Sequence, residues 1–281
     1  MLWEGGRRGG GIEDRRGMGG VGVAGGGIGT LALALIGYFV FGINPFVTQQ
    51  VVSQFDNTGV AEQGRPGTPD DRAGLFVDVI SANVNDVWSA KVGGYQPPRV
   101  VLYERGTSTG CGFGQSAMGP FYCPNDATVY LDLSFWREME TRLGTSGTDF
   151  ARAYVIAQEF GHHVQKLTGA TEKVRVIQER ASSQAQANAA SVSLELQADC
   201  FAGVWAANAS AASGGRVAME SGDLEEGLRT ANAIGDDTLQ RQATGRVTPE
   251  RFTHGTSAQR VEWLKRGYES GDPRQCDTFA P

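Results

Sequence analysis

The chain has 281 residues, which is enough for one well-packed domain and an additional segment. Hydrophobic residues make up 40% of it, a little below the average of soluble proteins, so it can still bury a core. The net charge of -6, from 25 basic and 31 acidic residues, provides no basic surface for DNA or RNA, and we expect no nucleic-acid partner.

An uncharged, glycine-rich stretch follows the first residues. No charged side chain occurs from Gly17 to Phe55, and residues 21–43 are apolar enough to cross the ~30 Å hydrocarbon layer as a helix. A cleaved signal peptide is the alternative, but the apolar stretch is longer than a usual signal core, and residues 1–20 before it include acidic side chains. We therefore predict one uncleaved transmembrane helix.

Basic residues are distributed unevenly about this predicted span. Four arginines precede it, and the next basic residue after it is Arg65. The positive-inside rule then places the N-terminus in the cytoplasm and the large domain outside it. The predicted organisation is a cytoplasmic segment, a transmembrane helix, a linker and a folded domain, over residues 1–20, 21–43, 44–67 and 68–281.

The four cysteines contain no CxxC pair of the kind that zinc ribbons or redox sites use. In an oxidising compartment two disulfides are expected. Cys111 with Cys123 would close a short loop, which leaves Cys200 with Cys276 to fasten the C-terminal tail. Four cysteines permit three connectivities, so this pairing is an inference.

The first half of the folded domain is expected to contain a helix, two paired strands and a further helix. Apolar residues recur at helical spacing over 70–91, and two runs rich in β-forming residues follow at 100–103 and 128–133. Another helix should begin at Ser134. The glycine-rich segment between the two strands, 106–124, is expected to be an irregular surface loop.

Three helices are predicted in the second half, over residues 148–167, 187–208 and 256–270. The first has apolar residues three or four apart and is followed by Gly169, which favours its termination. The last begins with Thr256-x-x-Gln259, a capping-box pattern, and Gly271 should end it.

The first of these helices contains Gln158-Glu159-Phe-Gly-His162, which differs by one residue from the HExxH signature of zinc peptidases. In that signature two histidines four residues apart bind Zn²⁺ from one helix face, and the glutamate acts as general base. Glu159 and His162 are in place, whereas the first ligand position is Gln158. A di-iron site is excluded because the Glu-x-x-His pattern occurs once, and such sites need two.

The sequence resembles the bacterial neutral zinc metallopeptidase family over almost the whole chain. Seven segments match the family's blocks in its order: MLWEGGRRGGGIEDRRGMG, TGCGFGQSAMGPFYCPNDATVYLDLSFW, AYVIAQEFGHHVQ, LELQADCFAGVWA, ANAIGDD, FTHGTSAQR and RGYESG. The resemblance implies an α+β zincin-like domain that is anchored in the bacterial cell membrane by one helix, uses Zn²⁺ and cleaves peptide or protein substrates.

The resemblance also implies roles for residues outside the helix motif. Glu195 resembles the third ligand of zincins in which a carboxylate from a second helix completes the site. Asp199, one turn on, would accept a hydrogen bond from a ligand imidazole. His254 and Arg260 resemble a block near the metal, where His254 would stabilise the oxyanion and Arg260 would orient carboxylates.

Each of these residues has a structural alternative. His162 alone would more often be a satisfied helix histidine, and His254 could be a structural loop residue. Glu195 and Asp199 could form a solvated acidic face, although their apolar neighbours favour partial burial. His163 projects about 100° away from the preceding residue around the helix, and we expect it to be a hydrogen-bonded packing residue.

Gln158 divides the functional hypotheses, because a neutral amide is a poor zinc ligand compared with imidazole. Three remain: a peptidase in which Gln158 is a weak ligand or the site is rearranged, an enzyme that uses another metal, and an inactive pseudopeptidase that binds peptides or partners. The favoured hypothesis is a zinc peptidase with Glu159 as base, and with His162, Glu195 and Gln158 as ligands. The runner-up is the non-catalytic binding or scaffold protein.

Overall fold

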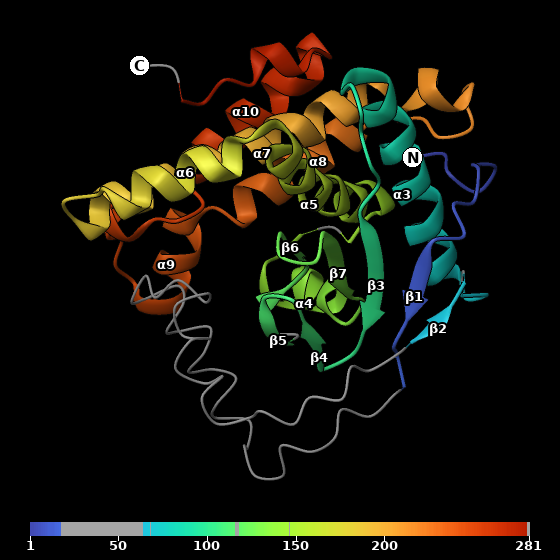
Figure 1. The fold of residues 1–281 in the computed structure, drawn as a ribbon, viewed down its shortest axis with the longest axis horizontal. Coiled ribbons are helices and arrows are strands. Elements are labelled where there is room, and N and C mark those ends of the chain that lie inside the picture. The colour runs from blue at the N-terminus through green and yellow to red at the C-terminus, as the bar shows by residue number, and fades with distance from the viewer. Residues whose placement is uncertain (18–63, 68, 116–117, 146, 280–281) are drawn as a thin grey trace.

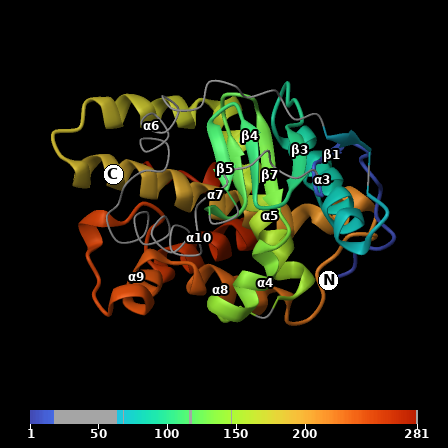
Figure 2. The same ribbon diagram turned by 90° about the horizontal axis from the view of Figure 1, so that it is seen from below.

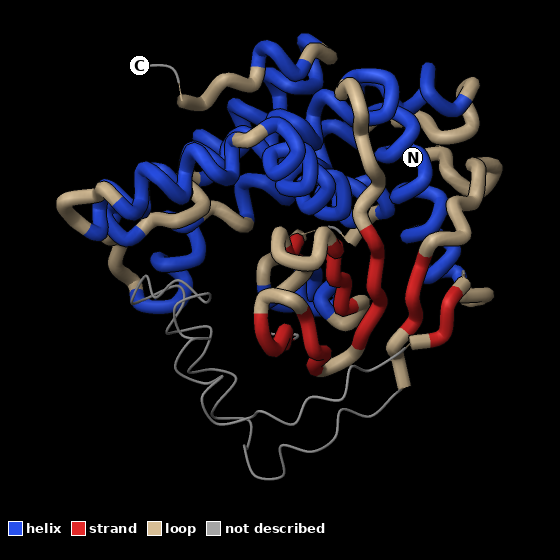
Figure 3. Tube along the Cα trace, in the orientation of Figure 1, coloured by secondary structure: helices blue, strands red, loops and turns tan. Residues whose placement is uncertain are grey.

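The computed structural model describes residues 1–279 apart from 18–63, 68, 116–117 and 146. The predicted transmembrane helix at 21–43 and most of the predicted linker lie outside the described residues. Within the described residues, no helix is both long and apolar enough to cross a membrane. Helices and strands are both present and occupy separate parts of the molecule (Figure 3), so the predicted α+β class is confirmed.

Five strands form the main sheet, in the order β2-β1-β3-β7-β6. Their bounds are β1 Ile12–Asp14, β2 Arg65–Pro66, β3 Arg99–Tyr103, β6 Phe121–Cys123 and β7 Thr128–Asp132. The three central strands run parallel, and the two edge strands are antiparallel to their neighbours. The strands predicted at 100–103 and 128–133 are therefore confirmed as β3 and β7, directly paired.

The two faces of β3 belong to different clusters, because successive side chains of a strand point to opposite faces. Val100 and Leu102 join the main core with the helices. Val101 and Tyr103 join a smaller cluster that includes the disulfide-bonded Cys123. The sheet thus has a buried side chain layer on each face.

The segment 106–124, predicted to be an irregular loop, contains a second, small sheet and strand β6 of the main sheet, so that prediction is wrong. Strands β4, Gly106–Thr109, and β5, Gly112–Gln115, pair as an antiparallel hairpin. The predicted disulfide between Cys111 and Cys123 forms, and it fastens the hairpin to β6. Glycines at these strands hid the pattern, because they weaken the alternation of apolar and polar residues.

Three long helices pack together on one side of the sheet: α5 Asp149–Thr168, α7 Gln184–Ser213 and α10 Ser257–Ser270 (Figure 1). The predicted ends of α5 and α10 follow from capping residues next to them in the sequence. Thr148 caps α5 by accepting from the Ala151 N–H, and Gly169 ends it with φ 84°. The predicted capping box between Thr256 and Gln259 opens α10.

The remaining helices surround this group. They are α3 Arg72–Lys91, α4 Phe135–Arg142, α6 Ala170–Glu179, α8 Asp223–Ala233 and α9 Asp236–Thr244, with short 3₁₀ turns at Pro249–Arg251 and Pro273–Gln275. Seen from below, β1 and α3 lie at one end of the molecule, and α6 and α9 lie at the other (Figure 2).

The domain boundary also differs from the organisation inferred from the sequence, which separated residues 1–20 from a domain beginning at 68. Residues 1–17 pack against the rest of the structure, and β1 is an inner strand of the main sheet. Trp3 and Ile12 are both buried in the main core. The physical reason is a set of contacts between residues far apart in sequence, which local patterns do not reveal.

Helices α7 and α10 approach so closely that glycine is required at the contact. A Cβ on Gly267 would lie 1.9 Å from the Cys200 carbonyl oxygen, and one on Gly203 would lie 2.2 Å from the Leu264 carbonyl oxygen. The predicted disulfide between Cys200 and Cys276 forms beside this contact. It fastens the C-terminal tail to α7.

We predict that Gly267→Ala destabilises the protein by about 1–3 kcal/mol or more, because backbone atoms must move apart to admit the methyl group. Thermal and denaturant unfolding measure the change. Gly93→Ala is the matched control, since a Cβ there has no heavy atom within 4 Å. Equal stability of the two variants would contradict the close packing of α7 and α10.

Candidate active site

Three side chains converge between α5 and α7. Gln158 and His162 lie one turn apart on α5, and Glu195 faces them from α7. The Gln158 Nε2 atom is 3.1 Å from His162 Nε2 and 3.0 Å from Glu195 Oε2. His162 Nε2 and Glu195 Oε2 are 3.4 Å apart. The structure therefore brings together all three residues proposed as metal ligands.

The ring of His162 is oriented by Gln165. The Gln165 amide nitrogen donates to the Leu194 carbonyl oxygen at 2.6 Å and to Gln197 Oε1 at 3.2 Å. Its oxygen therefore faces His162, and it accepts from Nδ1 at 2.8 Å. Because Nδ1 carries this proton, Nε2 is the nitrogen that faces Gln158 and Glu195, as a metal-ligating histidine requires.

The spacing of the His162 and Glu195 donor atoms fits a zinc ion. Ligand atoms at about 2.0–2.1 Å from a tetrahedral Zn²⁺ lie about 3.3–3.4 Å from one another. Gln158 is different, because the amide directs its NH₂ group to the centre, and a nitrogen of this kind does not ligate metals. Turning the amide over would present Oε1 instead, and the two orientations are distinguished only by their hydrogen bonds.

Among the residues that the structure describes, no group of three or more His, Cys, Asp and Glu side chains is arranged to hold a metal ion. Of the three converging side chains, only His162 and Glu195 are of these types, because the third is Gln158. The donor set is thus two strong ligands and one amide oxygen that becomes available by rotation.

Glu159 follows Gln158 on α5, is 6% exposed and interacts electrostatically with His162 and Glu195. Burial raises the pKa of its carboxyl group to about 7, and the neighbouring Glu195 carboxylate adds to the rise, while the charges of His162, His254 and Arg260 oppose it. A carboxyl group with a pKa near neutrality can both accept and return a proton, which is the property that a general base needs.

His162 and Glu195 form a tightly coupled buried pair. Burial alone would lower the pKa of His162, but the adjacent Glu195 carboxylate outweighs it, and the net change is upward. Burial alone would raise the pKa of Glu195, whereas the His162 and His254 charges lower it. The two groups therefore favour a charged pair that shares a proton.

His254 reaches the site from the loop before α10 and is held by Asp236, the first residue of α9. The Asp236 carboxylate accepts from the His254 and Thr253 backbone N–H groups, each at 2.7 Å, and lies 3.3 Å from His254 Nδ1. Burial opposes a charge on His254, but Glu195 and Asp236 outweigh it and raise the pKa of its ring. His254 interacts electrostatically with both Glu159 and Glu195, so it belongs to the cluster.

Asp199 does not have the partner that the sequence analysis expected. Its carboxylate is fully buried and accepts from Arg260 Nε at 2.8 Å, Arg260 Nη2 at 2.9 Å and the Tyr154 hydroxyl at 2.6 Å. The expected bond to a ligand imidazole is made by Gln165 instead. Arg260 does orient a carboxylate, as expected, and that carboxylate belongs to Asp199.

His163 is a packing residue, as predicted. It is 2% exposed, donates from Nε2 to the Gln96 carbonyl oxygen at 2.6 Å, and accepts at Nδ1 from the Tyr122 hydroxyl at 2.9 Å. With both nitrogens used in this way the ring is neutral, and burial lowers its pKa.

Three residues of the site were not identified from the sequence: Gln165, Asp236 and Tyr154. Gln165 lies three residues after His162 on the same helix, and this spacing could have indicated it. Asp236 lies in the ANAIGDD block, which carried no assigned role. Tyr154 has an apolar helical spacing that suggested only core packing.

A pocket of about 450 Å³ is lined by residues of α7, of the turn near Pro249 and of α10. Val192, Leu196, Phe252 and Trp263 form its apolar walls, and Asn188 and Gln259 add polar groups. Leu196 directly follows Glu195 in the chain, although no residue of the cluster lines the pocket.

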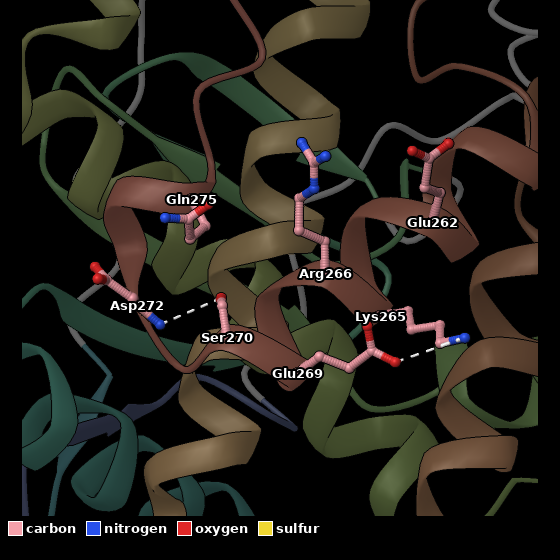
Figure 4. Close-up of a pocket in the computed structure, with 7 residues that line it drawn as sticks. All are labelled: Glu262, Lys265, Arg266, Glu269, Ser270, Asp272 and Gln275. Atoms are coloured by element: carbon pink, nitrogen blue, oxygen red, sulfur yellow. Dashed lines mark hydrogen bonds and ion pairs between the residues drawn. The ribbon is translucent and has the colours of Figure 1, made fainter.

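A second hollow, along α10, is charged and open (Figure 4). Lys265 and Glu269 on its wall are 3.6 Å apart, and no residue of the candidate site lines it. Its acidic and basic groups are close enough to compensate one another, so it offers no strong ligand chemistry.

Comparisons with known proteins give a consistent result. A family model described as "Putative neutral zinc metallopeptidase" matches residues 1–279. The uncharacterised protein YpfJ of Escherichia coli strain K12 is 49% identical over 99% of both chains. The uncharacterised protein Rv2575 of Mycobacterium tuberculosis strain H37Rv is 45% identical over 70% of this chain and 68% of its own. No solved structure matches the chain significantly.

We predict that Arg260→Met destabilises the domain by about 3–5 kcal/mol, because it leaves the Asp199 carboxylate buried without a counter-ion. Denaturant unfolding measures the loss. The double variant Asp199→Leu/Arg260→Met removes both charges and should recover most of the stability. A single variant within about 1 kcal/mol of the wild type would contradict the role of this ion pair.

Proposed function

The chain belongs to the neutral zinc metallopeptidase family, and from this premise we propose that it hydrolyses peptide bonds at the cluster of Gln158, Glu159, His162, Glu195 and His254. Family membership supports a hydrolase in general. The residues that carry the reaction, the metal and the substrate are parts of the proposal.

One observation carries the proposal. His162 Nε2 and Glu195 Oε2 come from different helices and lie 3.4 Å apart, and the buried carboxyl group of Glu159 interacts electrostatically with both. That separation suits two ligands of one zinc ion. With its amide turned over, Gln158 would complete the set.

The proposed chemistry divides between the metal and the protein. A zinc ion at such a site supplies Lewis acidity, which polarises a peptide carbonyl group and makes a nearby water more acidic. Glu159 takes the proton from the attacking water and returns it to the leaving amine as the peptide bond breaks. His254, positioned by Asp236, donates a hydrogen bond to the developing oxyanion.

The pocket that includes Leu196 and Phe252 supports a peptide as substrate. Leu196 directly follows Glu195 in the chain, and Phe252 lies two residues before His254. We propose that the pocket receives an apolar side chain of the bound peptide. Two disulfides further support a location outside the cytoplasm. We also propose that the protein is held at the bacterial membrane.

A second function is favoured by the orientation of Gln158. Its NH₂ group donates to Glu195 at 3.0 Å, and the charged His162 ring pairs with the same carboxylate at 3.4 Å, so these side chains have partners without a metal ion. A protein with this arrangement could bind peptides or partners without cleaving them. The choice between the two functions depends on whether the site binds metal.

We predict that the full chain, purified in detergent, binds zinc and cleaves peptides, and that Glu159→Gln lowers kcat by about 10²–10⁴-fold by removing the base. Gln158→His should raise zinc affinity by about 10–100-fold or more, since it restores a first ligand. Metal analysis and a peptide-library assay measure both effects. Glu225→Gln, an exposed change on α8, is the control.

A wild type that binds no metal and shows no hydrolysis dependent on Glu159 would overturn the peptidase proposal. If Gln158→His alone then gains zinc and activity, the natural protein is a binding protein with the remains of an active site. If Gln158→His gains no activity either, the cluster is not a peptidase site.

Metal binding should also depend on pH. Glu195 raises the pKa of His162, so below that value a proton must leave before a metal can bind. Because that pKa is raised to about 9, we predict that affinity increases by up to about tenfold per pH unit as the pH rises towards about 9. Calorimetric titration in buffers of different ionisation enthalpy measures the proton released. Affinity independent of pH, with no proton release, would contradict the charged pair.

A further inference from the structure

Within the first 17 residues, Ile12–Asp14 form β1, an inner strand of the main sheet. β1 pairs in parallel with β3, with Ile12 opposite Val100 and Asp14 opposite Leu102. On its other side β1 pairs with β2, where Asp14 lies opposite Arg65. An inner strand uses the hydrogen-bonding groups of both edges, so β1 is a structural member of the sheet.

The residues before β1 are bound to the helices. Trp3 is 5% exposed, packs edge-on against Phe76 of α3 with ring centroids 5.1 Å apart, and donates to Asp149 at 2.8 Å. Asp149 is the first residue of α5, the helix that carries Gln158 and His162. The N-terminal segment therefore supports the start of the active-site helix.

A buried carboxylate secures the middle of the segment. Asp78 of α3 is 1% exposed and accepts from the backbone N–H groups of Gly9 at 3.0 Å and Gly10 at 2.9 Å. A Cβ on Gly9 would lie 3.4 Å from the Cβ of Ala82. The backbone of this segment thus lies directly on α3.

The arginines that suggested a cytoplasmic N-terminus contact the folded domain. Arg15 is 9% exposed and donates to Thr107 Oγ1 at 2.8 Å and to the Ser108 carbonyl oxygen at 3.0 Å. Arg7 and Arg16 form ion pairs with acidic residues of the same domain. These arginines have partners within the fold, so their number before the apolar stretch does not by itself determine orientation.

Residues 64–67 also lie next to β1. The Gly64 N–H donates to Glu13 Oε1 at 2.9 Å, and the Gly67 N–H donates to the Ile12 carbonyl oxygen at 2.9 Å. Residues on both sides of the segment 18–63 are therefore neighbours. A single crossing of a membrane would separate them by the ~30 Å of its hydrocarbon layer.

We propose that residues 1–17 lie on the same side of the membrane as residues 64–281. The single-span topology predicted from the sequence requires instead that β1 and Trp3 leave the domain. The proposal concerns topology alone and does not depend on peptidase activity.

Single-cysteine labelling in bacterial spheroplasts tests the proposal. All four native cysteines are paired, so wild type should not react with a membrane-impermeant maleimide. Gly5→Cys and Gly93→Cys each place a thiol at an exposed position, where an added Cβ meets no heavy atom within 4 Å. We expect both to be labelled without lysis.

Labelling of Gly93→Cys alone, with Gly5→Cys reacting only after lysis, would overturn the proposal. Protection of both until lysis would support the shared compartment while contradicting the proposed location outside the cytoplasm. The labelling results therefore test on which side of the membrane each residue lies, and none of them depends on peptidase activity.

A crosslink tests the packing directly in the full chain. In Gly9→Cys/Ala82→Cys the two Cβ atoms would lie close to the separation found across a disulfide. We expect an intramolecular bond, seen by mass spectrometry after digestion without reductant. Gly5→Cys/Ala82→Cys is the control and should remain unlinked, because a Cβ at Gly5 has no neighbour within 4 Å. Absence of the Gly9 crosslink, even with added oxidant, would overturn the packing.

Discussion

The candidate site depends on one buried ion pair between Asp199 and Arg260. Asp199 lies on α7 one turn after Glu195, Arg260 lies on α10, and the Tyr154 hydroxyl joins them from α5 one turn before Gln158. Arg260 also donates to a backbone carbonyl just before α9. A single charge pair therefore links α5 and α7, which carry the proposed ligands and base, to α10, the helix that follows His254. Because both charges are buried, neither can turn to solvent without leaving the other unpaired.

The sequence was sufficient where structure depends on nearby residues. Thr148 and Gly169 delimit α5, and a capping box opens α10, because caps are set by side chains within one turn. Local patterns failed for the β4–β5 hairpin, whose strands are short and contain glycine. They failed again for β1, which is three residues long and becomes a strand only by pairing with residues far along the chain. Such pairing is decided by the whole fold.

The candidate site shows the same division. Glu159 and His162 follow from the spacing of one helix, and the likeness of a second block to a known family brought in Glu195. The partners that orient these groups did not follow, since a hydrogen bond depends on which helix faces which. Asp199 was assigned to the wrong neighbour for this reason, while Gln165 makes the contact. Gln158 presents another difficulty. Its amide group has an NH₂ donor and an oxygen acceptor on the same carbon, so a rotation of the amide decides whether a donor or a possible metal ligand faces the cluster.

The disulfide between Cys200 and Cys276 spans 76 positions of the chain, and α8, α9 and α10 lie between its ends. A cut in the backbone anywhere within that interval would leave both pieces covalently joined. Since α10 also packs tightly on α7, the pieces would stay in contact as well as attached. A peptidase could therefore cleave a surface loop in this interval, and Arg260 would still lie opposite Asp199.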